Sequence, residues 1–356
     1  MLVHVMTSEN VYHVSFIQLI ERNFPIEQHR FIFRTKKFNR NNYKSSTQVE
    51  SRSNFLSLLL AIPTFLRAKK VYLHYLPYGP SLLFWSFYSL FSNRLVWIYW
   101  GGDITVYNER NKSITSRIYE VCRKIIITRL KNIAGFLDGD FNLIKEIYKT
   151  RATYTQVIYP IPINRNQLEE TSSSLLNQKK EGVTYILAGN SGDPSNNHLE
   201  IFDLIKKYKE ENIEIICPLS YGPNQEYISK VIQEGQSLFG SVFIPLTNFL
   251  KISEYSELLN KIDIAIMNHN RQQGLGNIAA VILLGKKVFI REETTTFTYF
   301  KTTNISVWNT LGIQNMSFQE FIYMNPYDAK RNKELILNVF SENNYVELWN
   351  NVLSIK

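Results

Sequence analysis

The stretch at residues 183–200, VTYILAGNSGDPSNNHLE, joins a strand to a helix through a turn that holds two glycines. The apolar run 183–188 predicts a buried strand, and a helix-like pattern follows over 197–210. Glycine lets a ligand approach the backbone closely, and a helix N-terminus presents unpaired N–H groups with a partial positive charge. The turn is therefore a candidate phosphate site made of Gly189, Asn190, Ser191, Gly192 and Asp193.

A simpler explanation of this turn stays open beside the phosphate site. The spacing is neither G-x-G-x-x-G nor a P-loop, because no Gly-Lys-Ser/Thr follows. A tight turn with Ser195 or Asn196 as the helix N-cap would use the same residue types. The residues alone leave the two interpretations evenly balanced.

Short apolar runs alternate with amphipathic runs along all 356 residues, which predicts an α/β fold with parallel sheets. Strands are expected at 2–6, 30–34, 71–76, 95–100, 133–137, 183–188, 213–217, 241–245, 263–267 and 287–291. Helices are expected at 13–23, 54–66, 81–92, 114–131, 141–149, 197–210, 225–236, 254–260, 277–284 and 331–340.

The alternation stops once, at a polar stretch rich in serine, asparagine and lysine. We therefore expect an N-terminal Rossmann-like domain over 1–165, a linker over 166–182 and a C-terminal Rossmann-like domain over 183–356. The last helix is a candidate to pack back on the first domain. Ligands of such sheets bind beyond the carboxyl ends of the strands, so we expect the two domains to face a central cleft.

A second glycine-bearing loop follows the expected strand 263–267 and reads NHNRQQGLG over 268–276. Arg271 offers a planar, permanently charged fork for phosphate oxygens. Gln272, Gln273, Gly274 and Gly276 complete a polar loop that opens the next helix. The alternative is an exposed basic loop without a ligand. We favour an anion site, because two such loops at equivalent strand ends converge on one cleft.

Two carboxylate motifs in the first half allow both a chemical and a structural interpretation. Asp103 ends the stretch Trp100-Gly101-Gly102-Asp103 after a strand, where it could act as a general base, or instead cap a turn or bind a backbone amide. Asp138-Gly139-Asp140 matches a three-letter metal motif, but we favour Asp140 as the N-cap of the helix 141–149. The six histidines show no ligand spacing, so no metal site is expected.

The charge is concentrated in the N-terminal part of the chain. Residues 1–150 carry 21 Lys and Arg against 10 Asp and Glu, whereas the rest carries 19 against 21. The expected helix 113–131 is basic and amphipathic, and the aromatic run 82–91 could lie in a membrane surface beside it. The candidate membrane contacts are Arg117, Arg123, Lys124, Arg129 and Lys131. An ordinary core helix with a solvated basic face explains the same pattern.

Other partner and compartment classes find less support in the residues. No helix-turn-helix, RNA-recognition or zinc-finger pattern supports a nucleic-acid partner for the basic half. Pro77, Gly79 and Pro80 interrupt the longest uncharged run, so no transmembrane helix is expected, and no signal peptide is visible. Cys122 and Cys217 are expected to be separate buried thiols.

Four motifs taken together resemble glycosyltransferase family 56. These are ILAGNSGDPSNNHLE at 186–200, CPLSYGPNQEYI at 217–228, RQQGLG at 271–276 and WGGD at 100–103. The resemblance implies a GT-B fold and a metal-independent transferase without a cofactor. It also implies a dTDP-sugar donor, an undecaprenyl-diphosphate-linked glycan acceptor and a peripheral place on the cytoplasmic face of the bacterial inner membrane. Asn196 and His198 would then join the two loops in donor binding, and Arg271 would stabilise the departing diphosphate.

This chain departs from the family pattern in several places, and these departures leave the identity of the donor sugar open. The family has alanine where this chain has Gly102 and arginine where it has Pro194, and the sequence diverges from the family pattern after Arg291-Glu292. Glu292 is a candidate for the donor ribose, and Tyr221 for a contact near the base. A nucleotide-sugar epimerase, or a non-catalytic nucleotide-sugar-binding scaffold on a membrane, remains the alternative to a transferase.

Overall fold

The computed structural model describes residues 1–37, 39–53, 55–109, 113–161, 179–222 and 224–355. The chain forms two compact units, one of Met1–Pro162 with Phe340–Lys356 and one of Ile163–Val339. We call them unit 1 and unit 2. Residues 166–178 of the expected linker lie outside the described residues, and residues 179–182 lead into the first strand of unit 2.

Unit 1 is built on a seven-stranded sheet in the order β3-β2-β1-β4-β5-β6-β7. All of its strand pairs are parallel. The strands are β1 (Leu2–Met6), β2 (His29–Phe33), β3 (Gln48–Ser51), β4 (Lys70–His74), β5 (Leu95–Ile98), β6 (Asn132–Gly135) and β7 (Thr153–Gln156). Its α-helices are α1 (Val11–Asn23), α2 (Phe55–Leu59), α3 (Ile62–Arg67), α4 (Ser81–Phe91), α5 (Gly101–Thr105), α6 (Ile114–Arg129), α7 (Asp138–Tyr148) and α16 (Glu342–Leu353).

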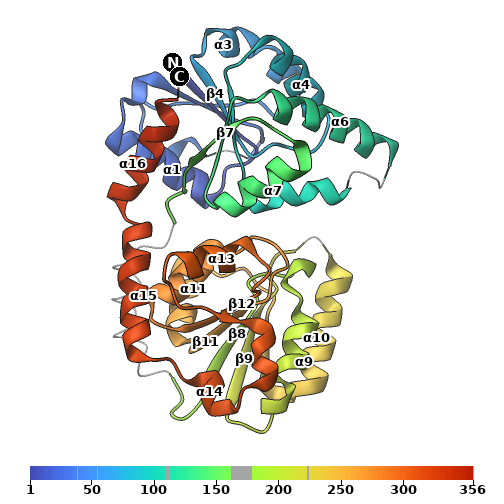
Figure 1. The fold of residues 1–356 in the computed structure, drawn as a ribbon, viewed down its shortest axis with the longest axis vertical. Coiled ribbons are helices and arrows are strands. Elements are labelled where there is room, and N and C mark those ends of the chain that lie inside the picture. The colour runs from blue at the N-terminus through green and yellow to red at the C-terminus, as the bar shows by residue number, and fades with distance from the viewer. Residues whose placement is uncertain (38, 54, 110–112, 162–178, 223, 356) are drawn as a thin grey trace. The chain divides into compact units, whose positions relative to one another are not determined.

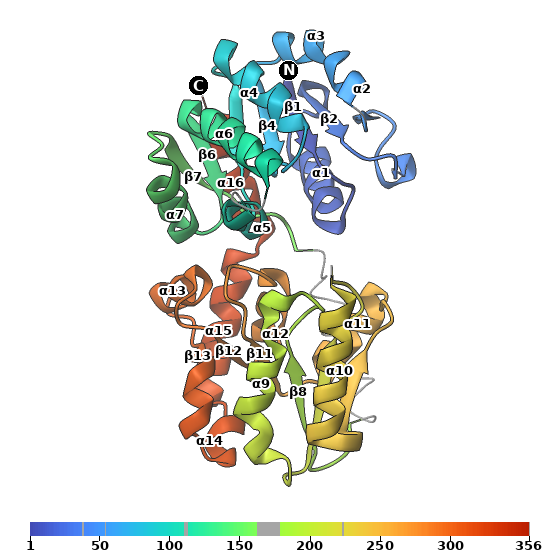
Figure 2. The same ribbon diagram turned by 90° about the vertical axis from the view of Figure 1, so that its right-hand side faces the viewer.

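Unit 2 has a six-stranded parallel sheet in the order β10-β9-β8-β11-β12-β13. The strands are β8 (Thr184–Ala188), β9 (Ile213–Pro218), β10 (Phe243–Leu246), β11 (Ile264–Met267), β12 (Lys287–Ile290) and β13 (Trp308–Asn309). Its α-helices are α9 (His198–Ile205), α10 (Gln225–Phe239), α11 (Ile252–Lys261), α12 (Leu275–Leu283), α13 (Thr295–Thr302), α14 (Phe318–Ile322) and α15 (Pro326–Val339). In each unit helices cover both faces of the sheet (Figures 1 and 2). The expected α/β class with two parallel sheets is therefore confirmed.

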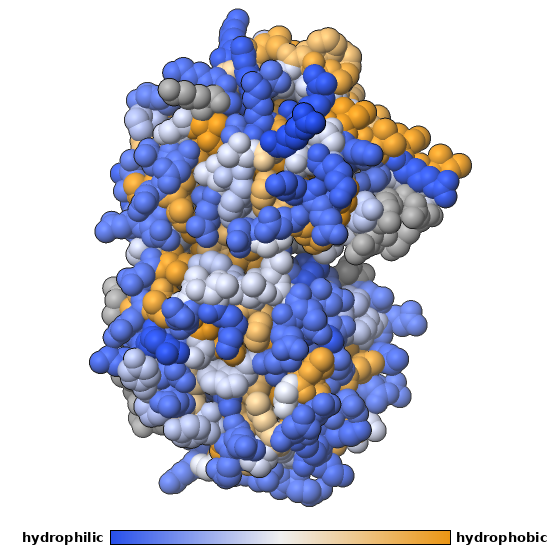
Figure 3. Space-filling view, in the orientation of Figure 1, coloured by the Kyte–Doolittle hydropathy of each residue, from blue (hydrophilic) through white to orange (hydrophobic). Residues whose placement is uncertain are grey.

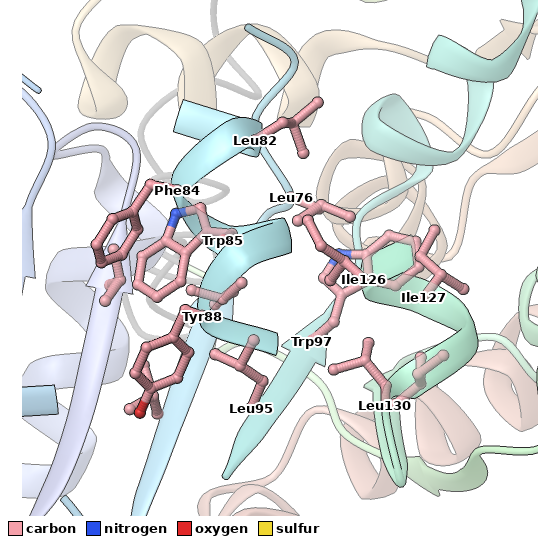
Figure 4. Close-up of a cluster of buried hydrophobic side chains, with 14 of the residues drawn as sticks. Leu76, Leu82, Phe84, Trp85, Tyr88, Leu95, Trp97, Ile126, Ile127 and Leu130 are labelled. Carbon is pink, nitrogen blue, oxygen red and sulfur yellow. The ribbon is translucent and has the colours of Figure 1, made fainter. Parts of the chain in front are cut away.

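The core of unit 1 lies between its sheet and the helices α3, α4 and α6. Trp85 and Trp97 are almost completely buried there. The labelled side chains of Figure 4 come mainly from α4, β5 and α6. Burying an aromatic side chain of this size removes about 150–250 Å² from water. At ~25 cal/mol per Å², each contributes roughly 4–6 kcal/mol as an upper bound.

The C-terminal helix α16 packs within unit 1. The indole N–H of Trp349 donates to the carbonyl of Ile158 at 2.9 Å, and the hydroxyl of Tyr72 donates to the carbonyl of Val352 at 3.1 Å. The ring of Trp349 lies 4.1 Å from that of Phe16 between ring centroids. The last turn of the chain is therefore anchored to the first helix and to the central strand β4.

The expected helix at 54–66 is two short helices in the structure. α2 ends at Leu59 and α3 starts at Ile62, with Pro63 in its first turn. Proline has no N–H to continue the hydrogen bonds of a preceding helix, but it fits the first turn of a new one. The helical spacing of apolar residues continues across the break, because each of the two helices buries an apolar side chain in the core. This continuity made the stretch look like one helix.

Candidate functional site

Two loops of unit 2 interlock at the carboxyl ends of neighbouring strands. β8 pairs with β11, so the loop 189–197 lies beside the loop 268–274. The side-chain amide of Asn197 donates to the carbonyl of Asn268 at 2.9 Å, and the backbone N–H of Asn270 donates to the carbonyl of Ser195 at 3.2 Å. The structure thus brings together the two glycine-bearing stretches that the sequence singled out.

A buried network of neutral polar groups fixes the first loop. The side-chain oxygen of Asn196 accepts the backbone N–H of Asn190 at 2.9 Å, and it lies 3.0 Å from the Nε2 atom of His269. The same Nε2 atom lies 2.9 Å from the side-chain oxygen of Asn190. The amide of Asn196 donates to the hydroxyl of Ser191 at 3.2 Å. Since all four side chains are buried, this network fixes the conformation of the loop.

Two glycines of these loops are required by their backbone and by their neighbours. Gly189 has φ +71° and Gly274 has φ +65°, a region that other residues rarely adopt. A Cβ atom on Gly189 would stand 2.6 Å from the Nε2 atom of His198, and one on Gly274 would stand 3.0 Å from the side-chain nitrogen of Asn190. Both glycines therefore serve close packing of the loop, whether or not a ligand binds.

A third loop, after β9, packs against the first one. The backbone N–H of Gly192 donates to the carbonyl of Tyr221 at 2.7 Å. A Cβ atom on Gly222 would lie 2.5 Å from the carbonyl carbon of Gly192, so the two backbones touch. The side chain of Tyr221 is 54% exposed and is available to a ligand at this edge.

Arg271 is the cation at the junction of the two interlocked loops. Its guanidinium lies 3.7 Å from the carboxylate of Asp193, and both side chains are partly buried. That carboxylate also accepts the backbone N–H of Ser195 at 2.9 Å and its hydroxyl at 2.6 Å. Burial opposes ionisation of Asp193, but the bonds from Ser195 and the charge of Arg271 outweigh it and lower the pKa. Asp193 thus ties Arg271 to the loop.

His198 places an unpaired ring nitrogen at this edge. The hydroxyl of Tyr227 lies 3.1 Å both from the backbone N–H of His198 and from its Nδ1 atom. That oxygen accepts the backbone N–H, and because it can also accept a second hydrogen bond or donate its own proton, it satisfies Nδ1 in either tautomer of the ring. The Nε2 atom is buried without a hydrogen-bond partner, beside Gly189. A buried polar atom without a partner next to a glycine turn suits a polar group of a ligand.

The remaining candidates of unit 2 lie at the same edge of the sheet or just inside it. The side-chain oxygen of Gln273 lies 2.5 Å from the hydroxyl oxygen of Ser195. Gln272 is partly buried on the second loop, and Gly276 is buried in the first turn of α12. Glu292 is exposed directly after β12. These positions are compatible with the expected donor contacts.

The cap predicted for the helix after the first loop is wrong. The helix α9 begins after Asn197, a residue with φ +50° whose side chain makes no cap bond. Ser195 and Asn196 belong instead to a short 3₁₀ turn, which Asp193 caps by accepting the backbone N–H of Ser195. The side chain of Asn196 is engaged in the network described above, because the 3₁₀ turn directs it toward the loop and away from α9.

Comparisons with known proteins agree with this geometry. The family model described as 4-alpha-L-fucosyltransferase, glycosyl transferase group 56, matches residues 21–356. The chain belongs to this family. It is therefore a glycosyltransferase, and the resemblance read from its motifs is confirmed.

Solved glycosyltransferases of low identity share the GT-B fold of this family 56 chain. WaaG, a glycosyltransferase involved in lipopolysaccharide biosynthesis, is similar with TM-score 0.66 at 11% identity over 100% of both chains. HepE of Anabaena, in complex with UDP and glucose, gives TM-score 0.70 at 12% identity over 99% of both chains. A trehalose-6-phosphate protein of E. coli bound with UDP-2-fluoro glucose gives 0.69 at 11% over 100% of both.

Asp103 of this family 56 chain is completely buried in unit 1, with both carboxylate oxygens engaged. One oxygen accepts the backbone N–H of Trp100 at 2.7 Å. The other accepts the backbone N–H of Leu76 at 2.9 Å and the indole N–H of Trp97 at 2.8 Å. Burial, partly opposed by the charge of Arg123 and by these bonds, raises the pKa to about 6. The geometry favours the amide-binding alternative for Asp103, and its role as a base stays a prediction.

The expected membrane contact of Arg123 is wrong, because this residue is buried on the inner side of α6. Its guanidinium donates to the carbonyls of Leu76 and Asp103 and to the hydroxyl of Tyr148. It also lies over the ring of Trp97, 5.1 Å from the centroid. The helical period puts Arg123 on the core side of α6, whereas Arg117, Lys124 and Arg129 are exposed on the helix and Lys131 is exposed just after it.

Asp140 does not cap a helix either. The helix α7 begins at Asp138 with Leu137 as its N-cap residue, so Asp140 lies inside the first turn and is buried. Among the residues that the structure describes, no group of three or more His, Cys, Asp and Glu side chains could hold a metal ion.

Sequence reasoning missed the residues that hold the loops together. His269, Asn197 and Glu200 were given no role, although all three stand in the two quoted stretches. Glu200 accepts both the side-chain amide of Asn268 at 2.6 Å and the guanidinium of Arg291, so it joins α9 to the ends of β11 and β12. No sequence signal marks these residues, because their partners lie on other strand ends.

Proposed function

We propose that this glycosyltransferase moves a deoxyamino sugar such as N-acetylfucosamine from a dTDP-sugar to a glycan on undecaprenyl diphosphate. The enzyme would act at the cytoplasmic face of the bacterial inner membrane, in the synthesis of a surface polysaccharide such as enterobacterial common antigen or O-antigen. The interlocked loops of unit 2 carry this proposal, because they present anion-binding groups at the carboxyl edge of a sheet in a family 56 chain.

The donor diphosphate would lie on the glycine-bearing loops. Arg271 supplies fixed charge, and the N-terminus of α12 after Gly274 supplies backbone N–H groups. The buried Nε2 atom of His198, which has no hydrogen-bond partner, lies beside Gly189. Stabilising the departing nucleoside diphosphate in this way needs groups that are already in position. The buried network around Asn196 supports this, since its hydrogen bonds fix the loop.

The nucleoside would lie beyond the diphosphate. Glu292 is exposed after β12 and could accept ribose hydroxyls, and the exposed ring of Tyr221 could cover the base. WaaG and HepE share the fold, and HepE is described with UDP and glucose. These likenesses support a nucleotide-sugar donor without naming its base.

The proposed membrane contact is a face of unit 1 that exposes apolar side chains at helical spacing. α4 and α6 pack side by side, and the ring of Phe65 in α3 packs on α4. Leucine and phenylalanine positions of α4 that lie three and four residues apart stay exposed, as does a matching row on α6. We call this set the apolar face: Phe55, Leu56, Leu59, Leu60, Leu66, Leu83, Phe87, Leu90, Phe91, Ile114, Ile118 and Val121. Figure 3 shows apolar side chains gathered at the upper right of the view.

Charge around the apolar face favours an anionic surface. Residues 51–102 contain no acidic residue and five basic ones. Arg117 and Lys124 are exposed on α6, and Arg129 donates to the carbonyls of Ser89 and Leu90 at the end of α4. An amphipathic face with cations around it matches a bilayer that carries acidic lipids. In the described part of the chain, no helix is long and apolar enough to cross a membrane.

Calorimetry with dTDP and with UDP, each with and without Mg²⁺, tests the donor site. Wild type is expected to bind dTDP without metal, and Arg271→Ala is expected to lose at least tenfold in affinity. Arg22→Ala is the matched control, because it removes one half-exposed arginine in unit 1. A failure of wild type to bind either nucleotide would refute the donor site. A requirement for Mg²⁺ would refute the metal-independent mechanism.

A transfer assay separates the transferase from its two rivals. Wild type, dTDP-N-acetylfucosamine and an undecaprenyl-diphosphate-linked disaccharide in anionic vesicles are expected to yield a longer lipid-linked glycan. Conversion of the donor without any lipid would indicate an epimerase. Donor binding and vesicle binding without turnover would indicate a scaffold.

A further inference from the structure

His13 lies in the first turn of α1, at the carboxyl edge of the sheet of unit 1. Its ring meets four other rings that come from the ends of strands or from the segments that follow them. The distances between ring centroids are 6.4 Å to Phe33, 6.1 Å to His74, 5.9 Å to Trp100 and 6.0 Å to Tyr159. This edge of a parallel sheet is where ligands of α/β folds bind.

Two contacts fix the position and the tautomer of this ring. The backbone N–H of His13 donates to the side chain of Asn10, the N-cap of α1, at 3.0 Å. The Nδ1 atom of the ring lies 2.6 Å from the carbonyl of Ser8. Because a carbonyl oxygen can only accept, Nδ1 carries the ring proton and Nε2 carries a lone pair. A group that orients an imidazole through one nitrogen leaves the other as a proton acceptor.

The Nε2 atom of His13 has no hydrogen-bond partner, although the side chain is only 2% exposed. The neighbouring buried histidines differ in this respect. His4 reaches His74 at 2.9 Å and His29 at 3.0 Å, and the second nitrogen of His74 meets the hydroxyl of Tyr159. An unsatisfied buried acceptor costs about 1–3 kcal/mol. A structural role explains the paired histidines and leaves Nε2 of His13 unexplained.

We propose that Nε2 of His13 is the proton acceptor for the reacting hydroxyl of the glycan acceptor. This inference rests on the proposed glycosyl transfer. In the step, the hydroxyl oxygen forms the new bond to the anomeric carbon of the donor sugar. The bond from that carbon to the diphosphate oxygen breaks and its electron pair leaves with the diphosphate. The hydroxyl proton passes to Nε2 of His13, which releases it to water afterwards.

The surroundings of His13 fit this role better than those of Asp103. Both oxygens of Asp103 already accept hydrogen bonds, from Trp100 on one side and from Leu76 and Trp97 on the other. Burial, partly opposed by the bond to Ser8, lowers the pKa of His13 to about 4, so the ring is neutral and its lone pair is available at neutral pH. Trp100 and Tyr159, whose rings contact that of His13, are partly exposed.

His13→Asn is the decisive variant. The asparagine amide can still donate to the carbonyl of Ser8, as Nδ1–H does, while the acceptor at Nε2 is removed. We expect kcat for transfer to fall by about 10²–10⁴. The affinity for dTDP is expected to stay within twofold, because the donor site lies in unit 2. His29→Asn is the matched control: it changes a buried histidine of the same sheet whose Nδ1 pairs only with His4, and it is expected to keep kcat within threefold.

Three results would overturn the assignment or its basis. A His13→Asn enzyme with kcat within threefold of wild type would overturn the role of His13 alone. Equal losses in His13→Asn and His29→Asn, in proportion to lost folded protein by near-ultraviolet circular dichroism, would make the effect structural. A wild-type chain that binds dTDP but transfers no sugar would overturn the proposed transferase, and with it the step that His13 is assigned to.

Discussion

The Nε2 atom of His198 lies 2.6 Å from the point where a Cβ atom on Gly189 would stand. The side-chain oxygen of Asn196 lies 2.8 Å from the same point, and Gly189 has φ +71°. An alanine at position 189 would therefore have a strained backbone conformation, and its Cβ atom would overlap the side chains of His198 and Asn196. We expect it to lower the free energy of unfolding of unit 2 by roughly 2–4 kcal/mol, as measured by urea denaturation. We also expect weaker dTDP binding, since the loop must shift.

Gly102→Ala is the control for this prediction. Gly102 lies in the helix α5 with ordinary backbone angles, and a Cβ atom there would meet nothing within 4 Å. The added methyl group should be neutral or stabilise by up to about 1 kcal/mol. Equal stability of Gly189→Ala and wild type would contradict the close packing of the loop.

Asp103→Asn tests whether the buried carboxylate is a structural acceptor. Three donors converge on its two oxygens, and an asparagine amide would place two N–H groups against at least one of these donors. We expect the variant to lose about 2–4 kcal/mol of unfolding free energy in unit 1. Transfer measured per folded molecule should fall far less than in His13→Asn.

A different pattern would restore the sequence-based prediction for Asp103. If Asp103→Asn unfolds like wild type but loses a hundredfold or more in kcat, the carboxylate is a proton acceptor after all. Denaturation curves and single-turnover rates on the same preparation distinguish the two results.

The sequence predicted the inner strands of both sheets because those strands are buried on both faces and read as apolar runs. β1, β4, β5, β8 and β11 all lie within two residues of their expected ends. The edge strands β3 and β7 were missed, since QVES and TYTQ have exposed ends and half-buried middle positions and contain few apolar residues. The pairing that makes them strands comes from β2 and β6, which lie far away in the sequence.

The candidate site was predictable to the extent that its residues follow strand ends. Arg271 and Gly189 were found because their residue types are unusual at such junctions. The sequence could not show that Arg123 lies on the core side of α6. A helical apolar pattern stays recognisable when one arginine stands among its buried positions. The pairing of His13 with Ser8 also lies outside sequence reasoning, since it depends on how the turn before α1 closes.

Removing aromatic side chains from the apolar face should weaken vesicle binding. Phe87 and Phe91 are 64% and 76% exposed on α4. Each could bury on the order of 100 Å² in a bilayer surface, worth ~2 kcal/mol at full insertion. We expect Phe87→Ser and Phe91→Ser each to reduce affinity for vesicles with acidic lipids by about tenfold in a sedimentation assay.

The matched control for this surface is Phe249→Ser, which removes an 80% exposed phenylalanine of unit 2. It should leave vesicle affinity unchanged. Arg117→Gln and Lys124→Gln should each weaken binding by about fivefold at low salt and less at high salt, because the charge attraction is screened. Equal losses for Phe249→Ser and Phe91→Ser would refute the apolar face as the contact.

The buried histidines should make the protein sensitive to mild acid. Burial lowers the pKa of all six, to about 4 for His13, His29 and His198, to about 3 for His269, and well below the ordinary value for His4 and His74. The unfolded chain binds protons on these rings near pH 6.5. Between pH 6.5 and 4.5 the unfolded state therefore holds more protons than the folded state, and stability falls with falling pH.

The size of the effect should differ between the two units. Unit 1 holds His4, His13, His29 and His74. Asp103, with a pKa raised to about 6, takes up a proton in the folded state, and this uptake offsets the destabilising effect of one histidine. Unit 2 holds only His198 and His269. Each uncompensated proton is worth ~1.4 kcal/mol per pH unit at most, so unit 1 should lose stability more steeply than unit 2. Urea midpoints that stay constant from pH 6.5 to 4.5 would mean that these rings are protonated in the folded protein.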